Sequence, residues 1–107
     1  PHALVSPRGE SGGIVDDALA LQGKRRRVAA EIPHFLVAPY LIRETDLILT
    51  LAERVARIFV PALGLRQLPP PLELPSFSMV LLWHERRHAD PAQRWLRELV
   101  VEVARAL

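Results

Sequence analysis

Apolar positions along the chain follow two different periods. Five short runs have the length and apolar content of β-strands, at residues 3–6, 27–32, 47–50, 65–68 and 77–83. Four longer segments have apolar residues at helical spacing: 13–22, 34–43, 52–59 with a further turn up to Gly64, and 91 onward. The pattern therefore predicts strands alternating with helices.

This alternation predicts an α/β fold with a mostly parallel sheet flanked by helices, in which each crossover is right-handed. The run at 47–50 is apolar almost throughout, which predicts a strand covered on both faces. Ligands on such sheets lie beyond the carboxyl ends of the strands, often at helix N-termini. The tripeptide 69–71 is Pro-Pro-Pro, which predicts a stiff connector between two subdomains.

Each predicted helix has an apolar side and recognisable ends. The first is expected to start at an N-cap formed by Ser11, to stop at Gly23, and to turn inward Ile14, Val15, Ala18, Leu19 and Leu21. The second is expected to turn inward Leu36, Val37, Tyr40 and Leu41. The last has Asp90 as N-cap, Pro91 as its first residue, and a stripe of Ala92, Trp95, Leu96, Leu99, Val100 and Val103. Trp83 and Trp95 are expected to pack the final strand and helix together.

Composition narrows the class of protein without naming a function. A chain of 107 residues, half of them apolar, forms one modest globular core. It has no cysteine, which fits the reducing cytoplasm, and no apolar run of about eighteen residues that would cross a membrane. The formal charge is only +2, and the one cationic run, residues 24–27, is expected to be a solvated turn rather than a DNA contact.

The sequence His84-Glu85-Arg86-Arg87-His88 matches the H-E-x-x-H motif of zinc proteases. That chemistry needs a helix, on which two histidines one turn apart hold the metal while the glutamate activates water. Here the motif lies between a predicted strand and the Asp90-Pro91 helix start. We therefore interpret it as a charged turn, with zinc hydrolysis as a minor alternative and no catalytic residue or cofactor assigned.

Residues 11–14, Ser-Gly-Gly-Ile, are the best candidate for a ligand contact on physical grounds. Unpaired N–H groups and the positive end of the helix dipole suit an anionic or hydroxylated group, and glycines let it approach the backbone. The alternative is a flexible turn before a capped helix, and the residues alone leave both open. Asp16 and Asp17 are expected to complement the dipole and not to act as an acid–base pair.

Taken together, the segments resemble the C-terminal half of the effector-binding domain of LysR-type transcriptional regulators, in the branch similar to nodulation regulators. The resemblance is carried by HALVSPRG at 2–9, GIVDDAL at 13–19, RRV at 26–28, IPHFL at 32–36, TDLI at 45–48, LLWH at 81–84, DPA at 90–92 and WLR at 95–97.

The resemblance implies one half of a periplasmic-binding-protein-like (type II) regulatory domain, with an effector between two α/β subdomains. Residues 1–71 would be subdomain II, and residues 72–107 the returning strand and C-terminal helix of subdomain I. The DNA-binding domain would lie outside this chain, which would contact DNA only through it. The last strand and helix would then need a further surface to cover them, and self-association as a dimer or tetramer is expected.

By the same resemblance, the effector site includes Gly12, Gly13, Ile14, Pro33, His34 and Phe35. Phe35 would supply an apolar wall and His34 a hydrogen bond; the alternatives are core packing for Phe35 and a surface or capping role for His34. The sequence thus predicts a cytoplasmic, non-enzymatic sensor of a small anionic or aromatic effector. A stand-alone interaction module is the other hypothesis.

Overall fold

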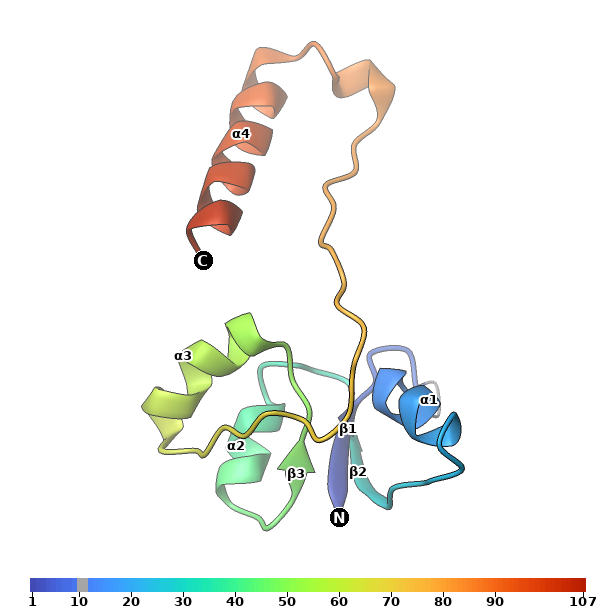
Figure 1. Cartoon of the computed structure of the whole chain (residues 1–107). Coiled ribbons are helices and arrows are strands. Elements are labelled where there is room, and N and C mark those ends of the chain that lie inside the picture. Colours follow the sequence, from blue (N-terminus) through green and yellow to red (C-terminus); the bar gives the residue numbers. More distant parts are fainter. Residues whose placement is uncertain (10–11) are drawn as a thin grey trace. The chain divides into compact units, whose positions relative to one another are not determined.

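The computed structural model of the chain describes residues 1–9 and 12–107. The chain divides into two compact units, Pro1–Pro75 and Ser76–Leu107 (Figure 1). This boundary lies close to the triproline connector at residues 69–71. The assignment of the two parts to subdomains II and I stays a prediction.

Unit Pro1–Pro75 is built on a three-stranded sheet with the order β2-β1-β3. The strands are β1 (His2–Val5), β2 (Val28–Ile32) and β3 (Ile48–Leu49). Both neighbours run parallel to β1, with Val5 opposite Ile32 and Ala3 opposite Leu49. The predicted α/β class with a parallel sheet is confirmed.

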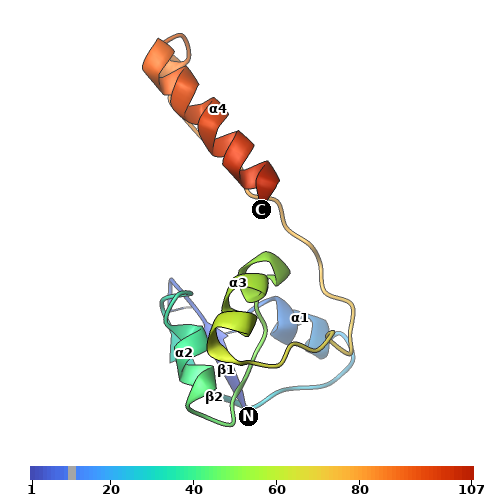
Figure 2. The same ribbon diagram turned by 90° about the vertical axis from the view of Figure 1, so that its left-hand side faces the viewer.

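Helices lie on both faces of this sheet. Helix α1 (Ile14–Ala20) connects β1 to β2, α2 (Ala38–Arg43) connects β2 to β3, and α3 (Glu53–Leu63) follows β3. Figures 1 and 2 show α1 and α2 on opposite sides of the strands. Because successive strand residues point to opposite faces, Ala3 and Val5 face α2, whereas Leu4 faces the start of α1.

The core on the α2 side is made of small residues and one large one. Ala3 and Ala38 are 1% and 0% exposed, so α2 lies close against the central strand, and Ile32 at 9% fills the neighbouring space. Val5, Leu41, Ile42, Leu47 and Leu49 pack around them. The proline after Ala38 is also fully buried.

Helix α2 begins four residues later than predicted, at Ala38 instead of His34. Pro39 explains the difference, because a proline fits the first turn of a helix but clashes inside one. Residues 35–37 form a turn instead. The predicted inward face was therefore wrong for three of its four members, since Leu36, Val37 and Tyr40 are 68%, 54% and 54% exposed. Tyr40 makes an edge-to-face contact with Phe59 of α3.

Two other predicted elements of this unit also differ. Strand β3 has two residues, and Ile48 is 57% exposed, so the strand is not covered on both faces. Residues 65–68 form no strand.

Helix α3 includes the predicted further turn, since it continues to Leu63. Gly64 ends it in the left-handed conformation at φ 65°, which glycine adopts readily. The predicted cap Ser11 lies outside the described residues; Gly13 is the N-cap residue of α1.

Unit Ser76–Leu107 contains a short 3-10 helix, η1 (Glu85–Arg87), and helix α4 (Pro91–Ala106). The predicted start of α4 is confirmed, because the Asp90 carboxylate accepts a hydrogen bond of 3.1 Å from the Gln93 N–H. Residues 77–83 form no strand with the described part of the chain. A strand needs a neighbour for its backbone groups, and an apolar run alone does not supply one.

The side chain of Trp83 packs locally in this unit. It stacks on His88, with ring centroids 6.0 Å apart, and the Arg97 guanidinium lies 4.4 Å from its ring centroid. Trp95, its predicted partner, is 64% exposed. No residue of this unit is buried within the chain.

Candidate functional site

The carboxyl ends of the three parallel strands meet at one edge of the sheet. Here the Ser6 N–H donates a hydrogen bond of 2.9 Å to the Ile32 carbonyl, so the segments that leave β1 and β2 start side by side. We name this region the carboxyl edge and define it by residues 6–9, 12–14, 33–35 and 50–52. It is the part of a parallel α/β sheet where ligands bind.

The six predicted site residues lie in the segments that follow β1 and β2, and their role in effector binding stays a prediction. Gly12, at φ 94°, leads into Gly13, and Ile14 begins α1 with 48% of its surface exposed. Residues 33–35 follow β2 directly. Phe35 is 51% exposed, which excludes plain core packing within this unit. His34 is an exposed residue outside α2, whose N-cap is Val37, so it does not cap that helix.

The strand order adds a segment that the sequence did not indicate. With β1 in the middle, the chain turns to β2 on one side and later to β3 on the other. Helices α1 and α2 lie on opposite faces (Figure 2), and Phe59 of α3 makes a ring contact with Tyr40 of α2. In parallel α/β sheets with such a reversal, ligands bind beyond the carboxyl ends of the strands where the order reverses, here β1 and β3. Thr50, Leu51 and Ala52 therefore join the candidate site.

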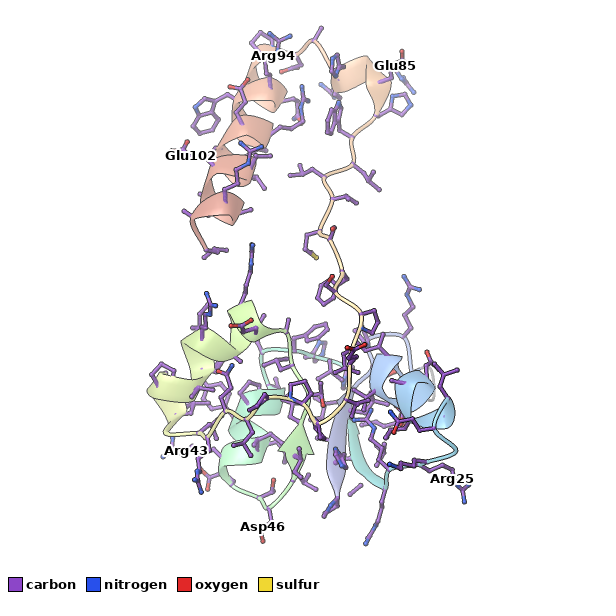
Figure 3. All side chains as sticks on the ribbon, in the orientation of Figure 1. Arg25, Arg43, Asp46, Glu85, Arg94 and Glu102 are labelled. Carbon is purple, nitrogen blue, oxygen red and sulfur yellow. The ribbon has the colours of Figure 1, made fainter. Side chains whose placement is uncertain are left out.

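A partly buried ion pair lies beside the carboxyl edge and joins Asp16, in the first turn of α1, to Arg26. The Arg26 guanidinium donates two hydrogen bonds to the Asp16 carboxylate, of 2.8 Å and 2.7 Å. The Arg26 side chain is 4% exposed and that of Asp16 is 27% exposed. The prediction that residues 24–27 form a solvated turn was therefore wrong for Arg26, whereas the Arg25 side chain points away from the ribbon (Figure 3).

These contacts stabilise the charged form of Asp16. The hydrogen bonds from Arg26 are the main reason that the pKa of Asp16 lies below its usual value. The charge of Arg26 and a hydrogen bond from the Gly13 N–H lower this pKa further, while burial opposes them. Asp16 is thus a fixed carboxylate next to the predicted glycine contact.

The H-E-x-x-H motif occupies a different setting, in unit Ser76–Leu107. Its residues span η1, a 3-10 helix of three residues. Nδ1 of His84 accepts a hydrogen bond from the Arg86 N–H, and Nδ1 of His88 accepts one from the Trp83 indole. The two imidazoles therefore serve separate local contacts. Over residues 1–9 and 12–107 no group of three or more His, Cys, Asp or Glu side chains is arranged to hold a metal ion.

Among the helices that the structure describes, none combines the length and apolar character needed to cross a bilayer.

The family of the chain follows from its similarity to known proteins. Residues 1–105 match the model of the LysR substrate binding domain. The chain is 35% identical over 102 residues to the HTH-type transcriptional activator NahR of Pseudomonas putida and 40% identical over 103 residues to NagR of Ralstonia sp.

In both alignments 95% of this chain is covered, against 34% of the relative. Nodulation protein D 3 of Rhizobium leguminosarum bv. phaseoli is 33% identical over 107 residues, which cover 99% of this chain and 35% of that protein. The chain thus spans about a third of the length of these curated relatives.

Solved structures show the same relationship. The regulatory domain of MexT, a transcriptional activator in Pseudomonas aeruginosa, aligns with a TM-score of 0.67 at 35% identity, over 94% of this chain and 50% of that one. The probable transcriptional regulator PA0477 from the same species aligns with a TM-score of 0.65 at 40% identity, over 69% of this chain and 25% of that one. The predicted family is confirmed: the chain belongs to the LysR substrate binding domain family.

Proposed function

We propose that this chain is the effector-sensing, C-terminal part of the regulatory domain of a bacterial LysR-type transcription regulator acting in the cytoplasm. A small aromatic molecule binds at the carboxyl edge and favours one arrangement of the regulatory domains. The arrangement alters how DNA-binding domains outside this chain sit on DNA. A difference in affinity between two arrangements of about 1–3 kcal/mol suffices for such coupling.

One observation carries the proposal: the parallel sheet brings exposed residues with suitable chemistry to one edge. Phe35, half exposed beside the end of β2, offers a flat apolar surface. His34 offers a hydrogen bond next to it. Gly12 and Gly13 let a ligand approach the backbone where α1 begins.

Gly13→Glu tests this site. Gly13 has an extended backbone at φ −163°, which any residue adopts, and a β-carbon there would lie 3.4 Å from Leu4 Cδ1, an ordinary contact. The variant should therefore fold, while its side chain blocks the edge. In the isotope-labelled wild-type chain we expect phenol, benzamide or benzoate to shift the amide NMR signals of Gly12, Ile14 and His34.

In Gly13→Glu these shifts should disappear, while the signals of β3 and α3 keep their positions. Gln22→Glu is the matched control, because it places the same carboxylate in the exposed segment beyond the other end of α1. A wild-type response in Gly13→Glu would remove this loop from the site.

We further propose that the chain self-associates through unit Ser76–Leu107. Helix α4 carries Leu96, Leu99, Val100 and Val103 with 47%, 38%, 40% and 53% of their surfaces exposed. An exposed apolar face of this kind is typical of an interface. The unit also contains a groove lined by Leu81, Trp83, Arg97 and Val101, among other residues.

In sedimentation equilibrium the chain should have the mass of a dimer or tetramer. Val103→Glu should reduce it to a monomer, and Arg94→Gln, a change at an exposed residue of α4 that does not line this groove, should not. A wild-type chain that is monomeric at high concentration would contradict the proposed association.

A further inference from the structure

The cationic run at residues 24–27 lies at the end of the sheet opposite the carboxyl edge. Arg27 directly precedes β2, and its carbonyl accepts a hydrogen bond of 2.8 Å from the N–H of His2, the first residue of β1. The run therefore lies at the amino ends of these two parallel strands. Asp46 precedes β3 at the same end, but β3 lies on the other side of β1 (Figure 3). The run and the candidate effector site are thus separate surfaces of this unit.

Contacts on both sides hold the backbone of this run. The Lys24 N–H donates a hydrogen bond of 2.9 Å to the Leu19 carbonyl in the last turn of α1, and the Arg27 carbonyl is bonded to β1. Between them, the Arg26 side chain is 4% exposed and donates to both carboxylate oxygens of Asp16. A surface whose backbone is already ordered loses less conformational entropy when it binds a partner.

The ion pair compensates the charge of Arg26 but leaves the other three cations of the run uncompensated. Lys24, Arg25 and Arg27 are exposed. Within the described part of the chain, no salt bridge involves any of them. The surrounding sequence, residues 22–30, contains no Asp or Glu. The pair thus anchors a loop that carries three positive charges at the surface.

We propose that Lys24, Arg25 and Arg27 contact the phosphate backbone of double-stranded DNA without reading its sequence. Exposed lysine and arginine side chains bind phosphate oxygens through charge-assisted hydrogen bonds, and each such contact releases a counterion from the duplex. Residues 21–31 contain no aromatic side chain on which an unpaired base could stack, which favours a duplex over a single strand.

The choice of DNA as the polyanion rests on the proposed function. In a transcription regulator, DNA-binding domains outside this chain hold it close to a duplex. Such tethering raises the local concentration of phosphate, so a contact that is weak in the isolated chain is formed in the whole protein. The family resemblance assigns DNA contact to those other domains, and the cationic run adds a contact made by this chain itself.

Titration of the isotope-labelled chain with a short DNA duplex of arbitrary sequence tests the contact. At low salt we expect the amide NMR signals of residues 24–27 to shift, while those of Gly12, Ile14 and His34 stay in place. Three phosphate contacts predict that the logarithm of the binding constant falls with the logarithm of the salt concentration with a slope of about −2.7. The combined variant Lys24→Gln, Arg25→Gln and Arg27→Gln should bind roughly tenfold or more weakly and lose most of this slope.

A second triple variant is the matched control, because it removes the same number of cations from exposed positions elsewhere in unit Pro1–Pro75. Its substitutions are Arg43→Gln, Arg57→Gln and Arg66→Gln, and it should retain the affinity and the shifts at residues 24–27. Equal losses in the two triple variants would mean that only net charge matters, and the inference would be wrong. A poly-glutamate peptide that shifts the same amides as strongly as the duplex would also overturn it.

The aromatic probes report on the carboxyl edge independently of DNA. A chain that binds the duplex through residues 24–27 but responds to no aromatic probe would keep this contact and lose the proposed effector site. A chain that responds to the aromatic probes but shows no duplex-induced shifts at low salt would keep the effector site and reject the DNA contact.

Discussion

Replacing Ile32 by alanine is expected to destabilise unit Pro1–Pro75 by about 3 kcal/mol, because it removes the largest buried side chain of the α2-side core. Ile32 is 9% exposed, and its buried neighbours Ala3 and Ala38 are too small to fill the space left behind. Domains of this size are stable by about 5–15 kcal/mol in total. Denaturant unfolding followed by circular dichroism would measure the loss.

Ile48→Ala is the matched control for this prediction. It removes the same atoms from a strand of the same sheet, but Ile48 is 57% exposed. Its cost should therefore stay below about 1 kcal/mol. Equal losses in the two variants would show that Ile32 does not form the core of this unit.

Local signals in the sequence predicted those elements whose ends are determined by their own residues. Asp90 and Pro91 start α4 as expected, because an N-cap and a first-turn proline need no distant partner. Gly64 ends α3 for the same reason, since the left-handed conformation at that position favours glycine. The strands β1 and β2 were also predicted to within a residue.

Elements that depend on partners were predicted less well. The spacing of Leu36, Val37 and Tyr40 predicted a buried helix face. The helix α2 starts later than predicted because of Pro39, and the side that is buried is the one on which Ala38 packs against the sheet. Residues 77–83 have the composition of a strand and no pairing neighbour in the described chain. A hydrophobic pattern indicates which residues tend to be buried, but it does not identify the surface that buries them.

In the candidate site, too, features set by local residues were easier to predict than those that depend on distant parts of the chain. The glycines before α1 were predicted from the residues themselves and the residues after β2 from the family resemblance, and both segments follow parallel strands of one sheet. The segment after β3 required the strand order, which the linear pattern does not contain. The pairing of Asp16 with Arg26 joins residues ten positions apart across a helix and a loop. Among four consecutive cations, residues 24–27, no property of the sequence marks Arg26 as the buried one.

Replacing Arg26 by methionine should therefore lower the stability of the fold markedly, whereas the same change at Arg25 should leave the stability almost unchanged. The methionine fills part of the space but leaves the Asp16 carboxylate without its two hydrogen bonds. Breaking a fully buried pair costs about 3–5 kcal/mol of stability. The Asp16 side chain keeps 27% of its surface exposed, so water can solvate part of its charge. We therefore expect the free energy of unfolding to fall by about 2 kcal/mol. Arg25 is exposed, so Arg25→Met measures the effect of lost charge alone.

The pH dependence of unfolding provides a second, independent readout of the same pair. Because the folded-state pKa of Asp16 lies below its unfolded value, the folded chain binds fewer protons in that range and stability rises with pH. The contribution is complete above the unfolded pKa of about 3.9 and is lost as the pH falls through the folded value. In Arg26→Met this acid-sensitive contribution should shrink, with the Asp16 pKa moving upward. An unchanged acid profile in Arg26→Met would mean that Arg26 does not hold the carboxylate in its charged form, and the fixed anion at the start of α1 would have to be abandoned.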